Sequence, residues 1–135
     1  MDLLQSMKIA AAGMRVQGTR LKVISENIAN ADSLSTVPGG DPYRRKVVTF
    51  QNVLDRSIGS DLVKVRKIDV DSSEFRKNYN PGHPAADKAG YVRLPNVNAL
   101  VEMMDMREAQ RSYQANVRIV DVSKKLMART VDLLR

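Results

Sequence analysis

The sequence predicts an α+β protein in which long N- and C-terminal helices pair as a coiled-coil-like stalk and carry a small β-rich insert between them. At both ends of the 135-residue chain, apolar residues recur at alternating steps of three and four. This 3.5-residue period is typical of a coiled-coil seam. Residues 41–94 lose that period and contain short alternating runs typical of strands. We therefore expect one structural unit in three parts, residues 1–34, 35–95 and 96–135.

The N-terminal helix is predicted from an apolar row that we call the N-terminal seam: Leu4, Met7, Ala11, Met14, Gly18, Leu21, Ile24 and Ile28. Its glycine and alanines are too small to fill a globular core, but they let another backbone approach closely. The row runs out at residues 25–33, SENIANADS. Asn30, Asp32 and Ser33, followed by Pro38, compete with helical hydrogen bonds or cannot make them, so the helix is expected to stop there.

The C-terminal helix is expected to begin after Pro95, with Asn96 or Asn98 as its N-cap. Glu102 and Asp105 would place negative charge near its positive end. No Gly or Pro interrupts residues 96–135, which predicts a helix roughly 57 Å long at 1.5 Å per residue. Its apolar row, the C-terminal seam, consists of Met103, Met106, Tyr113, Asn116, Val117, Val120, Met127, Val131 and Leu134.

A second apolar row widens the face of the C-terminal helix through Ile119, Val122, Leu126 and Leu133. The methionines of the two ends could indicate a peptide-binding groove, but their helical spacing favours packing along the seams. Both apolar faces are too long for the insert to cover. We therefore expect the helices to contact other subunits in an assembly.

The insert is predicted to contain strands at residues 47–50, 62–70 and 91–94, with turn residues at 80–84. The run Arg44, Arg45 and Lys46 opens the first of these strands. Such a run could bind phosphate, but it is more typical of charges that keep an exposed strand solvated and unpaired.

The composition excludes several kinds of chemistry. Without cysteine, the chain has no disulfide, thiolate metal site or thiol nucleophile. Its single histidine, His83, lies in a polar turn and has no second imidazole to share a metal with. No Gly-rich phosphate loop is present. We therefore expect no catalytic, metal or cofactor site, and an enzyme is the minority interpretation.

The net charge of +7 invites a nucleic-acid interpretation, with a basic coiled-coil DNA or RNA binder as the alternative. Along the sequence, however, each third of the chain mixes both signs, and aromatic residues that could stack on bases make up only 4%. No apolar run approaches the roughly 20 residues of a membrane span, and the first residues lack the features of a cleaved signal peptide. We expect a soluble protein without a conventional secretion signal.

The motifs identify a family resemblance that covers nearly the whole chain. Gly13-Met14-x-x-Gln17-x-x-Arg20-Leu21-x-Val23-Ile24-Ser25-Glu26-Asn27-Ile28-Ala29-Asn30-Ala31 is similar to the signature shared by the bacterial flagellar axial proteins, which form the rod and hook. The residues that place the resemblance nearest the proximal rod are Gly40-Asp41-Pro42-Tyr43-Arg44-Arg45-Lys46, Asn80-Pro81-Gly82-His83-Pro84-Ala85-Ala86-Asp87, Leu94-Pro95-Asn96-Val97-Asn98 and Arg111-x-Tyr113-x-Ala115-Asn116-Val117. A different axial protein is the runner-up.

The resemblance implies a structural protein without catalytic activity. Such a protein would leave the cytoplasm unfolded through the flagellar type III export apparatus and polymerise in the periplasm into the rod of the basal body, which transmits torque. Its partners would be other copies of itself and the rod components FlgB, FlgF and FliE, with no nucleic acid and no membrane insertion. Within the shared motif of Ser25, Asn27 and Asn30, the two asparagine amides are expected to bridge the helix end and an adjacent subunit.

Overall fold

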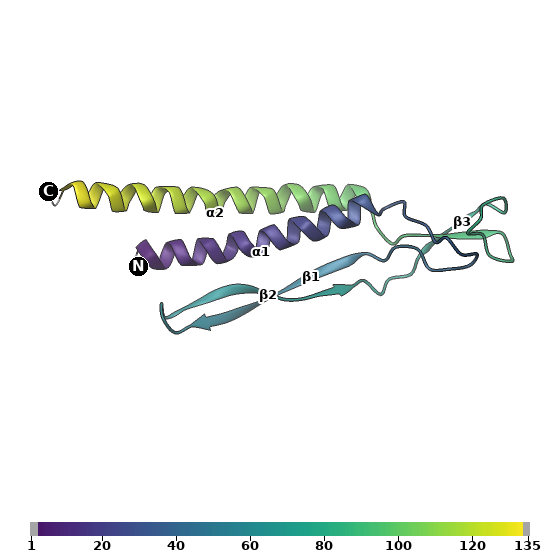
Figure 1. Cartoon of the computed structure of the whole chain (residues 1–135), viewed down its shortest axis with the longest axis horizontal. Coiled ribbons are helices and arrows are strands. Elements are labelled where there is room, and N and C mark those ends of the chain that lie inside the picture. The colour runs from purple at the N-terminus through teal and green to yellow at the C-terminus, as the bar shows by residue number, and fades with distance from the viewer. Residues whose placement is uncertain (1–2, 134–135) are drawn as a thin grey trace. The chain divides into compact units, whose positions relative to one another are not determined.

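The computed structural model describes residues 3–133 and confirms the predicted α+β class. The elements, labelled in Figure 1, are α1 (Leu3–Ala29), β1 (Lys46–Asp55), β2 (Ser60–Val70), β3 (Arg76–Tyr79), β4 (Tyr91–Leu94) and α2 (Ala99–Leu133). Strand β3 was not predicted from the sequence. Strands β1 and β2 form one two-stranded sheet, and β3 and β4 form another.

The contacts divide the chain into two compact units. Unit 1 consists of Met1–Leu21, Val48–Lys67 and Arg107–Arg135, and unit 2 of Lys22–Val47 and Ile68–Met106. Both helices and the first sheet contribute residues to each unit. The division of the chain at residues 34 and 95, expected from the sequence, stays a prediction.

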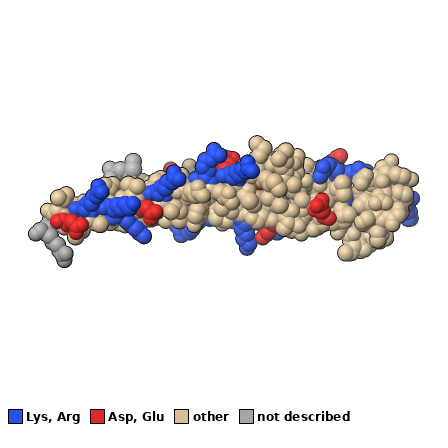
Figure 2. Space-filling view, turned by 90° about the horizontal axis from the view of Figure 1, so that it is seen from above, with Lys and Arg blue, Asp and Glu red and all other residues tan. Residues whose placement is uncertain are grey.

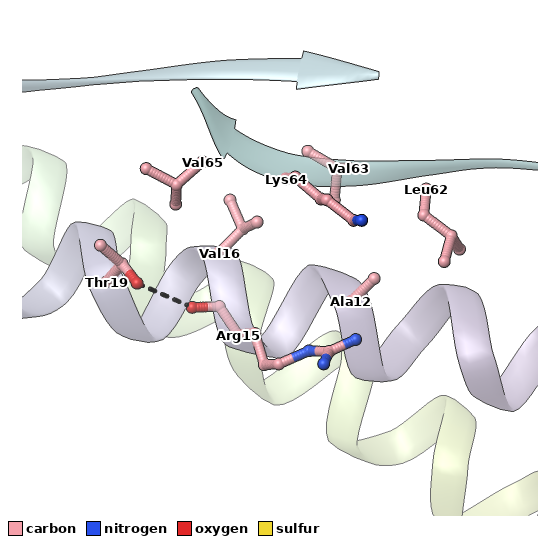
Figure 3. Close-up of a pocket in the computed structure, with 8 residues that line it drawn as sticks. All are labelled: Ala12, Arg15, Val16, Thr19, Leu62, Val63, Lys64 and Val65. Carbon is pink, nitrogen blue, oxygen red and sulfur yellow. Dashed lines mark hydrogen bonds between the residues drawn. The ribbon is translucent and has the colours of Figure 1, made fainter. Parts of the chain in front are cut away.

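In unit 1, the N-terminal part of α1 lies between the β1–β2 hairpin and α2 (Figure 1). Buried Ala12 and Val16 face the hairpin, where Leu62 of β2 is also buried (Figure 3). A hollow of about 220 Å³ remains between these elements, with Arg15 and Lys64 among its lining residues. The hairpin therefore packs loosely on α1 through small and β-branched side chains.

The opposite contact of α1 in unit 1 is with α2, and it is close because of a glycine. A Cβ atom added at Gly13 would stand 2.8 Å from Nδ2 of Asn116, so a side chain there would force Asn116 to move. Gly18 differs, because nothing lies within 4 Å of the position of its missing Cβ atom. One glycine of α1 therefore serves contact within the chain, whereas the space beside the other is open.

Unit 2 is built around the antiparallel β3–β4 pair, in which Arg76 lies opposite Leu94 and Tyr79 opposite Tyr91. The two tyrosine rings meet edge to face at 5.3 Å between centroids. Gly90 adopts a φ of 84°, and a Cβ atom there would approach the Tyr79 ring to 2.9 Å. Only glycine meets both conditions, so this residue fixes the loop that leads into β4.

Side chains define one end of each helix. Asn98 caps α2, because its Oδ1 accepts hydrogen bonds from the backbone N–H groups of Leu100 and Val101 at 3.1 and 3.4 Å. At the end of α1, Asn30 donates from Nδ2 to the carbonyl of Glu26 at 2.8 Å and accepts from the Ser33 hydroxyl. The predicted helix stop is therefore confirmed, and of the two predicted caps the structure selects Asn98.

Candidate functional site

The two buried polar side chains of unit 2, Asn27 and Glu102, lie in a polar cluster that also includes Tyr43, Arg45 and Lys46. At its centre, Asn27 is 1% exposed. Its Nδ2 donates to the Lys46 carbonyl at 2.9 Å and to Oε2 of Glu102 at 3.1 Å. Its Oδ1 accepts from the Lys46 backbone N–H and from the Tyr43 hydroxyl, both at 2.9 Å. One amide thus joins α1, the start of β1 and the first turn of α2.

Arg45 supplies the charge that balances Glu102. Glu102 is 1% exposed, and its Oε1 accepts a hydrogen bond of 2.6 Å from Nε of Arg45. The guanidinium also lies 3.5 Å from Asp71 and 4.0 Å from Asp105. Burial alone would lower the pKa of Arg45, but the hydrogen bond and attraction of Glu102, with those of Asp71, raise it overall. A buried carboxylate is therefore paired with a cation that stays ionised.

Asn96 fixes the backbone around this pair. Its Oδ1 accepts from the Arg45 backbone N–H at 2.8 Å, and its Nδ2 donates to the Asp71 carbonyl and to the Ser73 hydroxyl. Arg44 donates to the same Asp71 carbonyl, and its guanidinium lies 4.1 Å from the centre of the Phe75 ring. The segments before β1, after β2 and before α2 are thus held together by side chains bonded to backbone.

The sequence interpretation was wrong for two residues of the cluster. Asn27 does not have an amide available for an adjacent subunit, because all four of its hydrogen bonds lie within the chain. Arg45 does not solvate an exposed strand, because it is paired with buried Glu102. Glu102 was expected only to favour the helix dipole, and no pattern in the sequence indicated its burial.

Two carboxylates beside the cluster titrate below their usual range. The backbone N–H of Ser73, its hydroxyl and Arg45 lower the pKa of Asp71. The hydrogen bond and charge of Lys46, whose Nζ lies 3.0 Å from Oε2 of Glu26, lower the pKa of Glu26. A carboxylate whose pKa is depressed by folding stabilises the folded state above its unfolded pKa, and this contribution is lost as the pH falls through the folded pKa.

We therefore expect the free energy of unfolding to decrease as the pH is lowered from about 5 to below 3. Asp71→Asn should make this decrease shallower, because one depressed carboxyl no longer titrates. Ser73→Ala, which removes only one donor to Asp71, should have a smaller effect in the same direction. Urea unfolding at several pH values measures both, and an unchanged pH dependence in Asp71→Asn would contradict the assignment.

The chain itself covers the N-terminal seam only in part. Leu4, 50% exposed, and Ala11 are the exposed members, and Ile24 is the buried one. The half-buried members are Met7, Met14, Gly18, Leu21 and Ile28. Ser25, on the same side of the helix, is exposed.

The C-terminal seam is divided between half-buried and exposed positions. Met106, Tyr113, Asn116, Val117 and Val120 are half-buried, and Met103, Met127 and Val131 are exposed. Leu134 lies outside the described residues. In unit 1, Tyr113 lines an apolar groove together with Ala11, Met14, Arg15 and Gly18 of α1. The structure thus brings three members of one seam beside a member of the other.

The described residues differ from the patterns expected of metal ligands and of a membrane-spanning helix. Within residues 3–133, no three His, Asp or Glu side chains gather as metal ligands would. His83 accepts a hydrogen bond from the Ala85 backbone N–H at 3.0 Å, as a turn residue does. Neither of the two helices described has the apolar stretch needed to cross a lipid bilayer. The features that the described residues do show are the apolar seams of the two helices.

Proteins of known type match this chain along most of its length. Residues 88–133 match the family model described as flagellar basal body rod FlgEFG protein C-terminal. A protein of Agrobacterium fabrum named flagellar basal-body rod protein FlgC is 55% identical over 128 residues, which cover 95% of this chain and 92% of the relative. Proteins of the same name from Yersinia enterocolitica and Escherichia coli O6:H1 are 43% and 41% identical over 133 residues, 98% of each chain.

Proposed function

The chain belongs to the family of flagellar basal-body rod proteins named FlgC and is a structural subunit of the rod; from this premise we propose that it polymerises through its terminal helices into the shaft that transmits torque. The observation that carries this proposal is an apolar face of α1 in unit 1 that the chain covers only in part. At 3.6 residues per turn, α1 presents three faces there. Ala12 and Val16 face the hairpin, Gly13 and Arg20 contact α2, and the N-terminal seam occupies the third.

The composition of this third face suits a packed helix interface. Around Gly18 the surface is lined by Ala11, Met14 and Tyr113, and apart from the adjacent residues and backbone of α1 itself, no described atom lies within 4 Å of the position of the missing glycine Cβ. Small residues beside larger apolar ones let a neighbouring helix approach closely and bury the remaining apolar surface. A second subunit packed against the N-terminal seam would cover what this chain leaves open.

The remaining parts of the function are proposals that follow from the family. The protein would pass the type III export apparatus unfolded and assemble in the periplasmic part of the basal body. Its neighbours would be further copies and the rod components FlgB, FlgF and FliE. Its role would be structural and not enzymatic, with no cofactor and no nucleic acid.

The test is Gly18→Leu, which should leave the monomer folded but exclude it from the rod. The space beside Gly18 is open within the chain, and leucine favours helix more than glycine does, so the monomer should unfold at the same or slightly higher urea concentration. In a strain that lacks its own FlgC, this variant should restore neither motility nor the rod, because the leucine side chain occupies the space proposed for a neighbouring helix.

A matched control separates assembly from folding. Gly18→Ala adds only a methyl group at the same position and should retain most motility. Normal amounts of Gly18→Leu in isolated basal bodies would contradict the proposed role of the N-terminal seam.

A further inference from the structure

Folding separates charges that the sequence mixes. The described residues of unit 1 carry thirteen Lys and Arg against five Asp and Glu, a net charge of +8. Those of unit 2 carry eight Lys and Arg against nine Asp and Glu, a net charge of −1. The whole positive excess of the chain therefore belongs to unit 1.

On α2 the excess is concentrated in one line that we call the basic stripe: Arg107, Arg111, Arg118, Lys125 and Arg129. At 100° per residue these five positions fall within an arc of roughly 40° and extend over about 33 Å. All five are exposed, and none makes an ion pair with a residue within 3–133. Figure 2, which looks onto α2, shows Lys and Arg along much of its length, with a few Asp and Glu among them.

The basic stripe does not stabilise α2 in an isolated chain. Arg107 and Arg111, and likewise Lys125 and Arg129, are like charges four residues apart, an arrangement that destabilises a helix. Glu108 is paired with Arg20 of α1 at 3.5 Å. Asp121 and Asp132 lie beside the stripe without an ion pair to it, so negative charge from a partner would offset the repulsion more fully.

The second apolar row of α2 runs directly beside the basic stripe. Ile119, Val122, Leu126 and Leu133 fall on the side of the stripe nearer to α1, yet they are 46%, 54%, 44% and 87% exposed. The residues of α2 that do face α1, such as Ala109 and Ser123, are buried. Two parallel rows, one cationic and one aliphatic, are therefore open along the same length of helix.

We infer that this face of α2 binds an acidic amphipathic helix of a different protein chain. The inference rests on the proposed assembly into the rod through the terminal helices. A partner helix with carboxylates opposite the basic stripe and aliphatic residues opposite Val122 and Leu126 would satisfy both rows. Because the rows are straight and about 33 Å long, a long helix follows them better than a loop would.

A second copy of this chain does not supply such a helix. In unit 1, α1 and α2 together carry nine Lys and Arg and three Asp and Glu among the described residues, so their helices would repel the basic stripe. In unit 2 the carboxylates that lie on helices, Glu26, Glu102 and Asp105, already face cations of the same unit. Because neither described helix carries more Asp and Glu than Lys and Arg, we assign the acidic helix to another protein.

The composition of the apolar row also favours a protein over the other polyanions. Helices that lie on anionic membranes usually insert Trp, Phe or Leu, and single-stranded nucleic acid is bound by stacking on aromatic rings. The row has no aromatic residue to stack on bases or to anchor in a membrane interface. Its two leucines suit either a membrane or a helix, whereas Ile119 and Val122 suit packing between helices.

The test places a photoreactive amino acid at Leu126 or at Met14 in the full chain, in cells that build flagella. After illumination, the attached peptide is identified by mass spectrometry. At Leu126 we expect a peptide of a different protein with more Asp and Glu than Lys and Arg. Arg118→Glu combined with Lys125→Glu should lower that yield roughly tenfold, because two favourable charges become repulsive. The neutral pair Arg118→Gln and Lys125→Gln should lower it less, and Lys88→Glu, in unit 2, should leave it unchanged.

Each other outcome overturns the inference. A crosslink from Leu126 to a second copy, to lipid, to nucleic acid or to a peptide that is not acidic assigns this face to another occupant. No crosslink at Leu126 while Met14 crosslinks to a rod component leaves the proposed function intact and the inference wrong. If neither position crosslinks and the chain is absent from basal bodies, both the proposed function and this inference are wrong.

Discussion

Glu102→Ala is expected to lower the free energy of unfolding by about 2–4 kcal/mol, because it leaves the partners of a buried carboxylate without an acceptor. Arg45 would lose its 2.6 Å hydrogen bond, and Asn27 would keep a buried N–H with one partner fewer. The value lies below that of a fully buried pair, since the Arg45 side chain is 25% exposed and also faces Asp71. Urea unfolding followed by circular dichroism measures the change.

The matched control is Glu108→Ala on the same helix. Glu108 also pairs with an arginine, Arg20, but its side chain is 67% exposed, so its removal should cost no more than about 0.5 kcal/mol. Glu102→Gln keeps the shape and one acceptor and should fall between the two. Equal losses for Glu102→Ala and Glu108→Ala would mean that burial of the first carboxylate contributes nothing.

Asn27→Asp is expected to cost about 3 kcal/mol or more although the side chain keeps its size. The carboxylate cannot donate to the Lys46 carbonyl, and it stands where Nδ2 now lies 3.1 Å from Oε2 of Glu102. Two negative charges would meet in a buried site, and one of them would be forced to take up a proton. The loss should therefore shrink as the pH is lowered, which distinguishes repulsion from poor packing.

Asn30→Asp serves as the comparison for this prediction. Asn30 also donates one hydrogen bond, to the Glu26 carbonyl at the end of α1, but it is only half-buried and is not in contact with Glu102. Asn30→Asp should lower the free energy of unfolding by about 1 kcal/mol, as for other helix-end contacts, and this decrease should depend less on pH. Unfolding of both variants between pH 4 and 8 gives the answer, and parallel curves would refute the role assigned to Asn27.

The sequence predicted the local elements well because local rules decide them. The 3.5-residue period, the absence of Gly and Pro after Pro95 and the polar residues after Ala29 fixed both helices and their ends. Strand β3, Arg76–Tyr79, could not be predicted because its sequence contains two charged residues, an asparagine and no run of β-branched residues. These four residues form a strand because they pair with β4, and their own sequence does not indicate that pairing.

The polar cluster could not be predicted, for a different physical reason. Arg45, Asn27 and Glu102 each have a common local explanation, as a solvated charge, a helix-end residue and a dipole partner. Only the fold brings them within hydrogen-bonding distance and removes water from around them. The distribution of charge between the units could not be predicted either, because it also depends on the fold. Along the sequence, the segments of unit 1 alternate with those of unit 2.

The polar cluster also bears on the order in which parts of the chain fold. Asn27 and Glu102 are separated by 75 residues, and the bond between them cannot form before the first turn of α2 exists. Contacts between such distant residues require closure of a long loop, which slows folding relative to helices that form locally. A growing or threading chain that has not yet released residue 102 therefore lacks the acceptor that Asn27 and Arg45 share. We therefore expect unit 2 to close late in folding, which would suit the proposed export of the chain before it folds.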